Sequence, residues 1–383
     1  MLRNIRLIYI HNLLTDIRFQ SAFIVIYYAQ VAGSYTAATA VLAIETLSAA
    51  LFDIPTGIVS DKLGRKLTLT MGSTCFALSG TCYALAHGFG MLAAGATFYG
   101  LSYALFSGNN NALLFESLKA AGREKEFHHY QGRLSSMFQL GLGTSALIAS
   151  MIAPHGLRIV FICGIVPQVL AAIVSLFITE PRAHFDSEQK SLAHMKAAFK
   201  TILHNRRLRL LTIGNSISFG VGEAVFVFAP AFINRLWPIW AVAIYRAMAS
   251  FMGFIGFWFA GPILDRIKPA RALALAASYG LVSELAATIM ANVVSPVIFV
   301  SGSLLFGPYM VARDQIMQTE FTDQQRATLG SVVSFTASVV GSLSVLGLGM
   351  IGDHFGLRTA MFAGIIVGGL GVPIYVRLFR RYF

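Results

Sequence analysis

Charged residues are scarce in this sequence of 383 residues. Asp, Glu, Lys and Arg make up only 12% of it, whereas soluble globular domains carry about 25%. Hydrophobic residues supply 56%, and the mean hydropathy is +0.68. A soluble globular domain is therefore excluded, and the composition predicts an all-α polytopic membrane protein. Helices are the expected spanning elements because lipid offers no hydrogen-bond partner to an unpaired backbone group.

Cysteine is scarce as well, and the common motifs of enzymes and motors are missing. The three cysteines, Cys75, Cys82 and Cys163, lie inside apolar segments, with neither a disulfide framework nor zinc spacing. The nine histidines form no HExxH motif, and no GxxxxGKS or GxxxxGKT phosphate loop is present. A GxGxxG match at residues 347–352 lies in an apolar segment without a preceding strand, which favours close helix packing. We therefore predict no enzyme, no cofactor, no metal site and no ATP-driven motor.

Long apolar segments dominate the chain. A membrane-spanning helix needs about 20 mainly apolar residues. Twelve segments meet this length, near residues 8–32, 37–59, 67–87, 91–115, 132–153, 158–179, 208–233, 239–264, 271–291, 296–318, 328–351 and 358–378. The basic start leads into the first segment without a small-residue cleavage site, so we expect an uncleaved helix and not a signal peptide. The longest polar stretch, residues 180–207, is expected to be a linker with a surface amphipathic helix near 190–204.

Basic residues are unevenly shared between the two sides that these segments define. With the N-terminus inside, the inner loops and termini hold 23 of the 29 Lys and Arg residues. The outer loops hold only Arg158, Arg235 and Arg358, and three more arginines lie within segments. Because Lys and Arg resist translocation, this bias predicts that both termini lie in the cytoplasm. It also explains the net charge of +12 without a nucleic-acid partner.

The two halves of the sequence resemble each other. GIVSD at residues 57–61 recurs as GPILD at residues 261–265, an offset of 204 (261 − 57). HGLR at residues 155–158 recurs as FGLR at residues 355–358, an offset of 200 (358 − 158). Such duplication is typical of transporters that bind their solute near the membrane midplane, between the repeats. We therefore expect two pseudo-symmetric six-helix bundles, residues 1–180 and 207–383, joined by a cytoplasmic linker, residues 181–206.

The turn between the second and third segments, residues 57–66, reads GIVSDKLGRK. It resembles the signature loop between helices 2 and 3 of the major facilitator superfamily of secondary transporters. The six matching positions are Gly57, Asp61, Lys62, Gly64, Arg65 and Lys66. The Glu180-Pro181-Arg182 sequence after the sixth segment also resembles this family, as do the Gly-x-Arg entries to segments six and twelve. The alternative is an ordinary charged loop. The glycines are expected to let the two helix ends approach closely.

The resemblance implies a cytoplasmic gate around this turn. In that gate Asp61 and Arg65 latch the two halves, and Arg65 reaches Glu116 at the end of the fourth segment. The corresponding groups of the second half are Asp265 and Arg271, with Asp314 or Glu320. The complete predicted gate is Gly57, Asp61, Gly64, Arg65, Lys66, Glu116, Asp265 and Arg271.

Ionisable and amide side chains inside the spans are hypotheses for function, because each is costly in lipid. The acids Glu45, Asp53 and Glu223 are predicted proton or cation sites. Arg18 would be the counter-charge of Asp53 or Glu45, and Arg246 would pair with Glu223. The alternative is static ion pairs that fix helix packing, and Glu284 is expected to have a peripheral packing role. The predicted proton and substrate cavity is Arg18, Glu45, Asp53, Asn110, Glu223 and Arg246.

Five acids within the spans outnumber two central arginines, which favours proton coupling and a cationic or zwitterionic solute. The layout resembles bacterial drug–proton antiporters, although residues 94–108 lack the arginine that this branch carries in helix 4. We predict a monomeric exporter of a small amphipathic organic compound in the bacterial inner membrane, with protons or another cation as the coupling ion. Two alternatives stay open: a proton-coupled importer of a polar metabolite, and a lipid flippase or non-transporting receptor.

Overall fold

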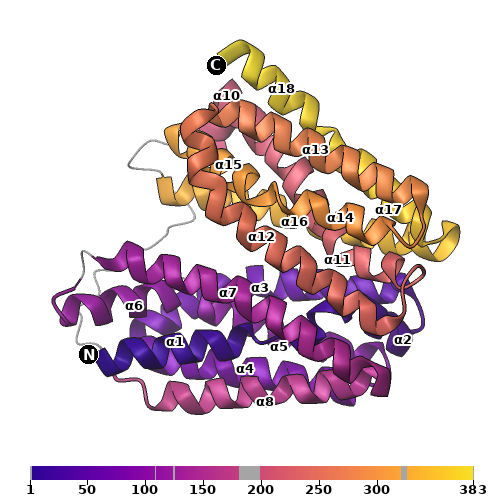
Figure 1. The fold of residues 1–383 in the computed structure, drawn as a ribbon. Coiled ribbons are helices and arrows are strands. Elements are labelled where there is room, and N and C mark those ends of the chain that lie inside the picture. Colours follow the sequence, from indigo (N-terminus) through magenta and orange to yellow (C-terminus); the bar gives the residue numbers. More distant parts are fainter. Residues whose placement is uncertain (1, 108, 124–125, 181–198, 321–325, 383) are drawn as a thin grey trace. The chain divides into compact units, whose positions relative to one another are not determined.

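The computed structural model describes residues 2–107, 109–123, 126–180, 199–320 and 326–382 (Figure 1). Helices account for nearly all of this part of the chain, and no strand occurs in it. The chain forms two compact units, Met1–Ser187 with Ile239–Ala247, and Glu188–Pro238 with Met248–Phe383.

The first unit begins with a predicted segment that is broken into three pieces. Its helices are α1 (Leu2–Asp16), η1 (Phe19–Ala22), α2 (Ile24–Ala32), α3 (Tyr35–Leu63), α4 (Arg65–Leu85), α5 (Phe89–Phe106), α6 (Asn109–Ala120), α7 (Phe127–Ile152), η3 (Ala153–His155) and α8 (Leu157–Leu176). Helices α3 and α5 pack closely, as do α4 and α8. Buried apolar side chains from α1, α4 and α6 join in one cluster with Ile178, and they include Ile8, Leu69 and Leu113.

The second unit repeats this use of long and interrupted helices. Its helices are α10 (Arg206–Asn215), η4 (Ser216–Gly220), α11 (Val221–Ile233), α12 (Ile239–Arg266, of which 248–266 belong here), α13 (Pro269–Met290), α14 (Ser295–Ser303), α15 (Phe306–Glu320), α16 (Arg326–Phe355), α17 (Leu357–Gly369) and α18 (Gly371–Tyr382). The expected amphipathic helix near 190–204 lies outside the described residues up to 198, and residues 199–204 are helical.

Ten helical stretches in the described part of the chain are long and apolar enough to cross a membrane. They correspond to ten of the twelve predicted segments. The two others are the first segment, which is broken at residues 17 and 18, and the third, α4. Among the ten, residues 206–233 contain a wider turn of π-helix at Ser216–Gly220. Such a turn frees backbone groups from the regular pattern and is common at functional sites.

Each unit contains helices that come into near backbone contact through a glycine. A Cβ atom added at Gly100 of α5 would lie 2.6 Å from the backbone nitrogen of Ala49 in α3. A Cβ atom added at Gly307 of α15 would lie 2.6 Å from the carbonyl oxygen of Gly256 in α12. Only glycine fits at such separations, so these two residues set how closely each pair packs.

Each unit also uses an arginine to cap a neighbouring helix. Arg158, near the start of α8, donates from Nη2 to the carbonyl of Ala86 at the end of α4, over 2.8 Å. Arg358, near the start of α17, donates from Nε to the carbonyl of Thr288 in α13 over 3.0 Å, and from Nη2 to the carbonyl of Ile289. A cation at a helix C-terminus satisfies free carbonyls and offsets the helix dipole. The repeated Gly-Leu-Arg sequence therefore has the same structural role in both units.

Candidate functional site

The turn between α3 and α4 consists of one residue, Gly64. It ends α3 and begins α4 with φ +90° and ψ 162°, a conformation that is essentially restricted to glycine. Its N–H donates to the carbonyl of Ser60 over 3.0 Å, and the Thr68 hydroxyl donates to the Gly64 carbonyl over 2.8 Å. The two helices can therefore follow each other without an intervening loop.

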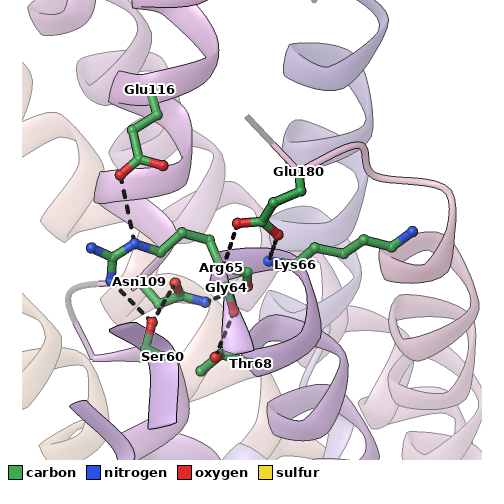
Figure 2. A network of polar contacts seen from close by, with 8 residues as sticks. All are labelled: Ser60, Gly64, Arg65, Lys66, Thr68, Asn109, Glu116 and Glu180. Carbon is green, nitrogen blue, oxygen red and sulfur yellow. Dashed lines mark hydrogen bonds and ion pairs between the residues drawn. The ribbon is translucent and has the colours of Figure 1, made fainter. Parts of the chain in front are cut away.

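The carboxylate of Glu180 caps the first turn of α4 (Figure 2). Its two oxygens accept the backbone N–H groups of Arg65 and Lys66, each over 2.7 Å. These amides have no carbonyl partner within the helix, and the helix dipole favours an anion at this end. A Cβ atom on Gly64 would lie 2.9 Å from the Glu180 carboxyl carbon, so glycine is required here for space as well as for conformation.

The Arg65 side chain connects the turn to α6 (Figure 2). Its Nη1 donates to the Ser60 hydroxyl over 3.0 Å, and its Nε lies 3.6 Å from Oε1 of Glu116. Asn109, fully buried at the start of α6, donates to the Arg65 carbonyl over 2.9 Å and accepts from Ser60 over 3.3 Å. Burial raises the pKa of Glu116, Arg65 opposes this effect and Glu180 adds to it. These contacts join α3, α4, α6 and the segment that follows α8. We call them the turn network, which consists of Ser60, Gly64, Arg65, Asn109, Glu116 and Glu180.

The other predicted gate residues either lie outside the turn network or take part in it only through their backbone. The expected close approach at Gly57 is wrong, because a Cβ atom there would meet nothing within 4 Å. Lys66 contributes its backbone amide, and the side chain of Asp61 lies outside the described residues. In the second unit, Asp265 and Arg271 are exposed and form no ion pair within the described chain.

The predicted partner Asp314 pairs with another arginine. Arg313 of α15 donates from Nε and Nη2 to Asp314 Oδ1, over 2.9 and 2.7 Å. Its Nη1 donates to Oδ1 of Asn215 over 3.2 Å, and its guanidinium carbon lies 4.8 Å from the centroid of the Phe219 ring. Arg313 is thus held against the irregular turn Ser216–Gly220. The side chain of the alternative partner, Glu320, lies outside the described residues.

Arg18 lies at the break in the first predicted segment, between α1 and η1. Its backbone has φ −127° and ψ 77°, and the side chain turns back so that Nε donates to the Thr15 carbonyl over 3.1 Å. Nη1 donates to the Tyr99 hydroxyl over 3.1 Å, and the guanidinium carbon lies 5.3 Å from the centroid of the Phe76 ring. Within the described chain, Arg18 forms no ion pair with Glu45 or Asp53. A carbonyl, a hydroxyl and an aromatic ring take the place of a carboxylate in its direct contacts, although the charge of Arg18 still acts on Glu45.

Glu45 of α3 is surrounded by tyrosines. Its Oε1 accepts from the hydroxyls of Tyr83 over 2.6 Å and Tyr28 over 3.2 Å. Both tyrosines are buried, and their ring centroids lie 5.0 Å apart. Tyr27 donates to the Tyr83 carbonyl over 2.8 Å and stacks on Phe161 at 4.1 Å. This half-buried carboxylate is held by neutral donors in the described structure, and only one of its oxygens is used.

The remaining predicted cavity residues are more dispersed. Asp53 is exposed on α3. Asn110 donates to Oδ1 of Asn12 over 3.3 Å, which links α6 to α1. Glu223 is exposed and Arg246 is half-buried, and they belong to different units, so their pairing stays a prediction. Glu284 is half-buried on α13.

Several residues of these sites did not follow from the sequence analysis. The capping role of Glu180, the bridging role of Asn109 and the tyrosines beside Glu45 depend on contacts between distant parts of the chain. Glu180 is 115 residues from Arg65, for example. The available signals were the polar Glu180 at the end of an apolar segment and the adjacent tyrosines 27 and 28.

The known proteins that this chain resembles in sequence are transporters. A family model described as the Major Facilitator Superfamily matches residues 12–345. A probable 4-methylmuconolactone transporter from Cupriavidus pinatubonensis is 24% identical over 317 residues, which cover 80% of this chain and 72% of that protein. An uncharacterized MFS-type transporter from Methanocaldococcus jannaschii is 31% identical over 137 residues, which cover 34% of this chain and 31% of that protein.

Solved structures with the same fold cover nearly the whole chain. A mutant of the nucleoside transporter NupG matches with a TM-score of 0.83 at 14% identity, over 98% of this chain and 100% of that chain. A bacterial homologue of the human lysosomal transporter Spinster, inward-facing and unoccupied, matches with a TM-score of 0.76 at 17% identity, over 99% of this chain and 96% of that chain. At such identities the likeness concerns the fold alone.

Proposed function

Because the chain belongs to the Major Facilitator Superfamily and is a secondary transporter of that type, we propose that protons drive it and that it exports a small amphipathic organic compound. It would work by alternating access, opening to one side of the membrane at a time. The following observations support this proposal.

The proposal of proton coupling rests on the surroundings of Glu45. A coupling site needs an ionisable group within a span that can gain and lose a proton during the cycle. An ion pair with an arginine would hold such a carboxylate in its charged form. Glu45 is bound instead by two neutral hydroxyls on one oxygen, within the apolar stretch Tyr35–Asp53. Protonation of the other oxygen would leave both of these hydrogen bonds intact.

We further propose twelve spans in two six-helix halves, residues 1–180 and 207–383, with residues 181–206 as a linker. Support comes from features that recur about 200 residues apart. Arg158 and Arg358 cap a neighbouring helix in the same way, and Gly100 and Gly307 bring equivalent helices together. The first span of each half is irregular, at residues 17–18 and at residues 216–220. The excess of basic residues on one side supports cytoplasmic termini in a plasma membrane.

The turn network is proposed to form part of a cytoplasmic gate. Glu180, at the end of the first half, holds the start of α4, and Arg65 holds α6 through Glu116. A conformational change in the linker that moves Glu180 would therefore also alter the α3–α4 turn. Asp61, Asp265 and Arg271 remain proposed members of the gate.

Proteoliposomes with an internal pH-sensitive dye would test the coupling. A solute that the protein carries should move protons through the wild type, and a pH gradient should accelerate its transport. Glu45→Gln should abolish proton movement but retain exchange of labelled for unlabelled solute. Glu284→Gln is the matched control, since it removes a half-buried span glutamate expected to be peripheral, and it should behave as the wild type does. Proton movement in Glu45→Gln at the wild-type rate would refute the assignment, and Asp53→Asn would then be the next variant.

Import of a polar organic metabolite is the second candidate. A polar organic metabolite as the solute is favoured by the relatives, which include a probable transporter of 4-methylmuconolactone and, by fold, a nucleoside transporter. Counterflow with 4-methylmuconolactone, uridine and a panel of amphipathic drugs would identify the solute. The direction of the proton gradient that drives accumulation would then separate export from import.

A further inference from the structure

Arg18 is fixed in the first span by three groups, none of which carries a negative charge. The Thr15 carbonyl binds Nε, the Tyr99 hydroxyl binds Nη1, and the Phe76 ring lies under the guanidinium. These partners come from α1, α5 and α4, so three helices hold the side chain in one place. A charged group within a membrane protein normally pairs with an opposite charge, because an isolated one is costly.

Two acids, Asp16 and Glu45, lie near enough to Arg18 to attract it electrostatically, but neither contacts its guanidinium directly. Glu45 accepts from two tyrosines through Oε1. The Cβ atom of Asp16 lies beside Gly141 of α7, and Asp53 is exposed. Within the described chain, none of them lies within ion-pair distance of Arg18. The positive charge is thus positioned by the protein with two acids nearby but no carboxylate in direct contact with it.

The guanidinium also retains hydrogen-bond donors. Nη2 has no protein partner within the described chain, and the Arg18 side chain is only half-buried. Tyr99 accepts from Nη1, which leaves its own hydroxyl proton available as a donor. A positive centre with an adjacent hydroxyl donor matches the needs of a carboxylate or a similar oxyanion, which accepts several hydrogen bonds at once.

We propose that the solute is an organic anion and that Arg18 binds its negatively charged group, with Tyr99 as a second donor. This inference rests on the proposed function only in that the protein carries a solute. It replaces the cationic or zwitterionic solute expected from the excess of acids in the sequence. It also gives Arg18 the role of a substrate-binding residue and not that of a counter-charge for Glu45.

Binding to the purified full chain in lipid nanodiscs would test the proposal, without any pH gradient. Three probes of nearly equal size differ in charge: benzoate, benzamide and benzamidinium. A second pair is 4-methylmuconolactone, used at a pH where its carboxylic acid is ionised, and its methyl ester. We expect thermal stabilisation by the two anions only. Arg18→Gln should weaken their binding by about tenfold to a hundredfold, and Arg18→Lys should retain part of it. Arg6→Gln, which removes an exposed arginine from α1, the helix that precedes Arg18, should leave binding unchanged.

The comparison of probes on the wild type remains decisive even if Arg18→Gln does not fold. Stabilisation by the neutral or cationic probes but not by the anions would overturn the proposal, as would no stabilisation by either anion at millimolar concentration. Equal anion binding by folded Arg18→Gln would overturn it as well. This binding assay does not measure protons, so its result is independent of the proton-coupling test on Glu45. Either proposal can therefore fail while the other one holds.

Discussion

Replacing Gly64 by alanine should disrupt the α3–α4 turn in two separate ways. The backbone at φ +90° and ψ 162° costs a residue with a Cβ atom about 1–3 kcal/mol. The added carbon would also lie 2.9 Å from the Glu180 carboxyl group and displace it from the amides of Arg65 and Lys66. Loss of these charge-assisted bonds costs about 1.5–3 kcal/mol. We expect a total destabilisation of about 2.5–6 kcal/mol.

Gly57→Ala is the matched control from the same signature turn. A Cβ atom there meets nothing within 4 Å, and the residue lies inside α3. Alanine is a better helix former than glycine, so this variant should be stabilised by about 0.5–1 kcal/mol. Unfolding of the purified chain in mixed detergent micelles would measure both variants under identical conditions.

A double-mutant cycle separates the two parts of the Gly64 effect. In a Glu180→Ala background the clash is absent, so Gly64→Ala should cost only the backbone strain of about 1–3 kcal/mol. A Gly64→Ala variant as stable as Gly57→Ala would refute the reasoning about the turn. An equal cost with and without Glu180 would refute the proposed steric conflict and leave strain as the only cause.

Three other predictions concern stability and its dependence on pH. Arg158→Gln and Arg358→Gln should each cost about 1 kcal/mol, since each removes a cation from the end of a neighbouring helix; unequal losses would contradict their equivalent roles. Gly100→Ala and Gly307→Ala should each cost about 1–3 kcal/mol by overpacking, and retention of the wild-type unfolding midpoint would contradict the close packing. Burial raises the pKa of Glu116, so its contribution to stability is complete below the ordinary glutamate pKa of about 4.3 and is lost as the pH rises through the raised value. Glu116→Gln should therefore flatten the decrease in midpoint above pH 4, and an unchanged slope would count against this assignment.

The helical segments were predictable from the sequence because lipid imposes one simple requirement, a long apolar run. Each of the twelve predicted segments is helical over most of its length, and ten meet the criteria for a membrane span. The interruptions were not predictable. The break at residue 18 is stabilised by Arg18, which caps α1 through the Thr15 carbonyl and is held by Tyr99 from another helix. Periodicity within one segment carries no information about such partners.

The site was predictable where its residues are close in sequence or form a known signature. The proximity of Arg65 and Glu116 was expected, and the two lie 3.6 Å apart. Arg18 contacts no carboxylate directly, although its charge acts on Asp16 and Glu45. Estimates of depth along a helix did not predict this, because they ignore the direction of the side chain. The close approach expected at Gly57 was wrong, whereas Gly64 does meet another element, the carboxylate of Glu180. A sequence motif identifies the residues, but their roles depend on what the fold brings beside them.

The break in the first predicted segment also has a consequence for biogenesis. Asp16 and Arg18 lie near the middle of residues 2–32, and each charged residue at the centre of an inserting helix costs about 2.5–3.5 kcal/mol. This stretch is not among the ten that are apolar enough to cross a membrane. The translocon should therefore retain it poorly until α3 emerges from the ribosome and the two enter the bilayer together. A topology reporter fused directly after Ala32 would then describe a nascent intermediate and not the mature protein.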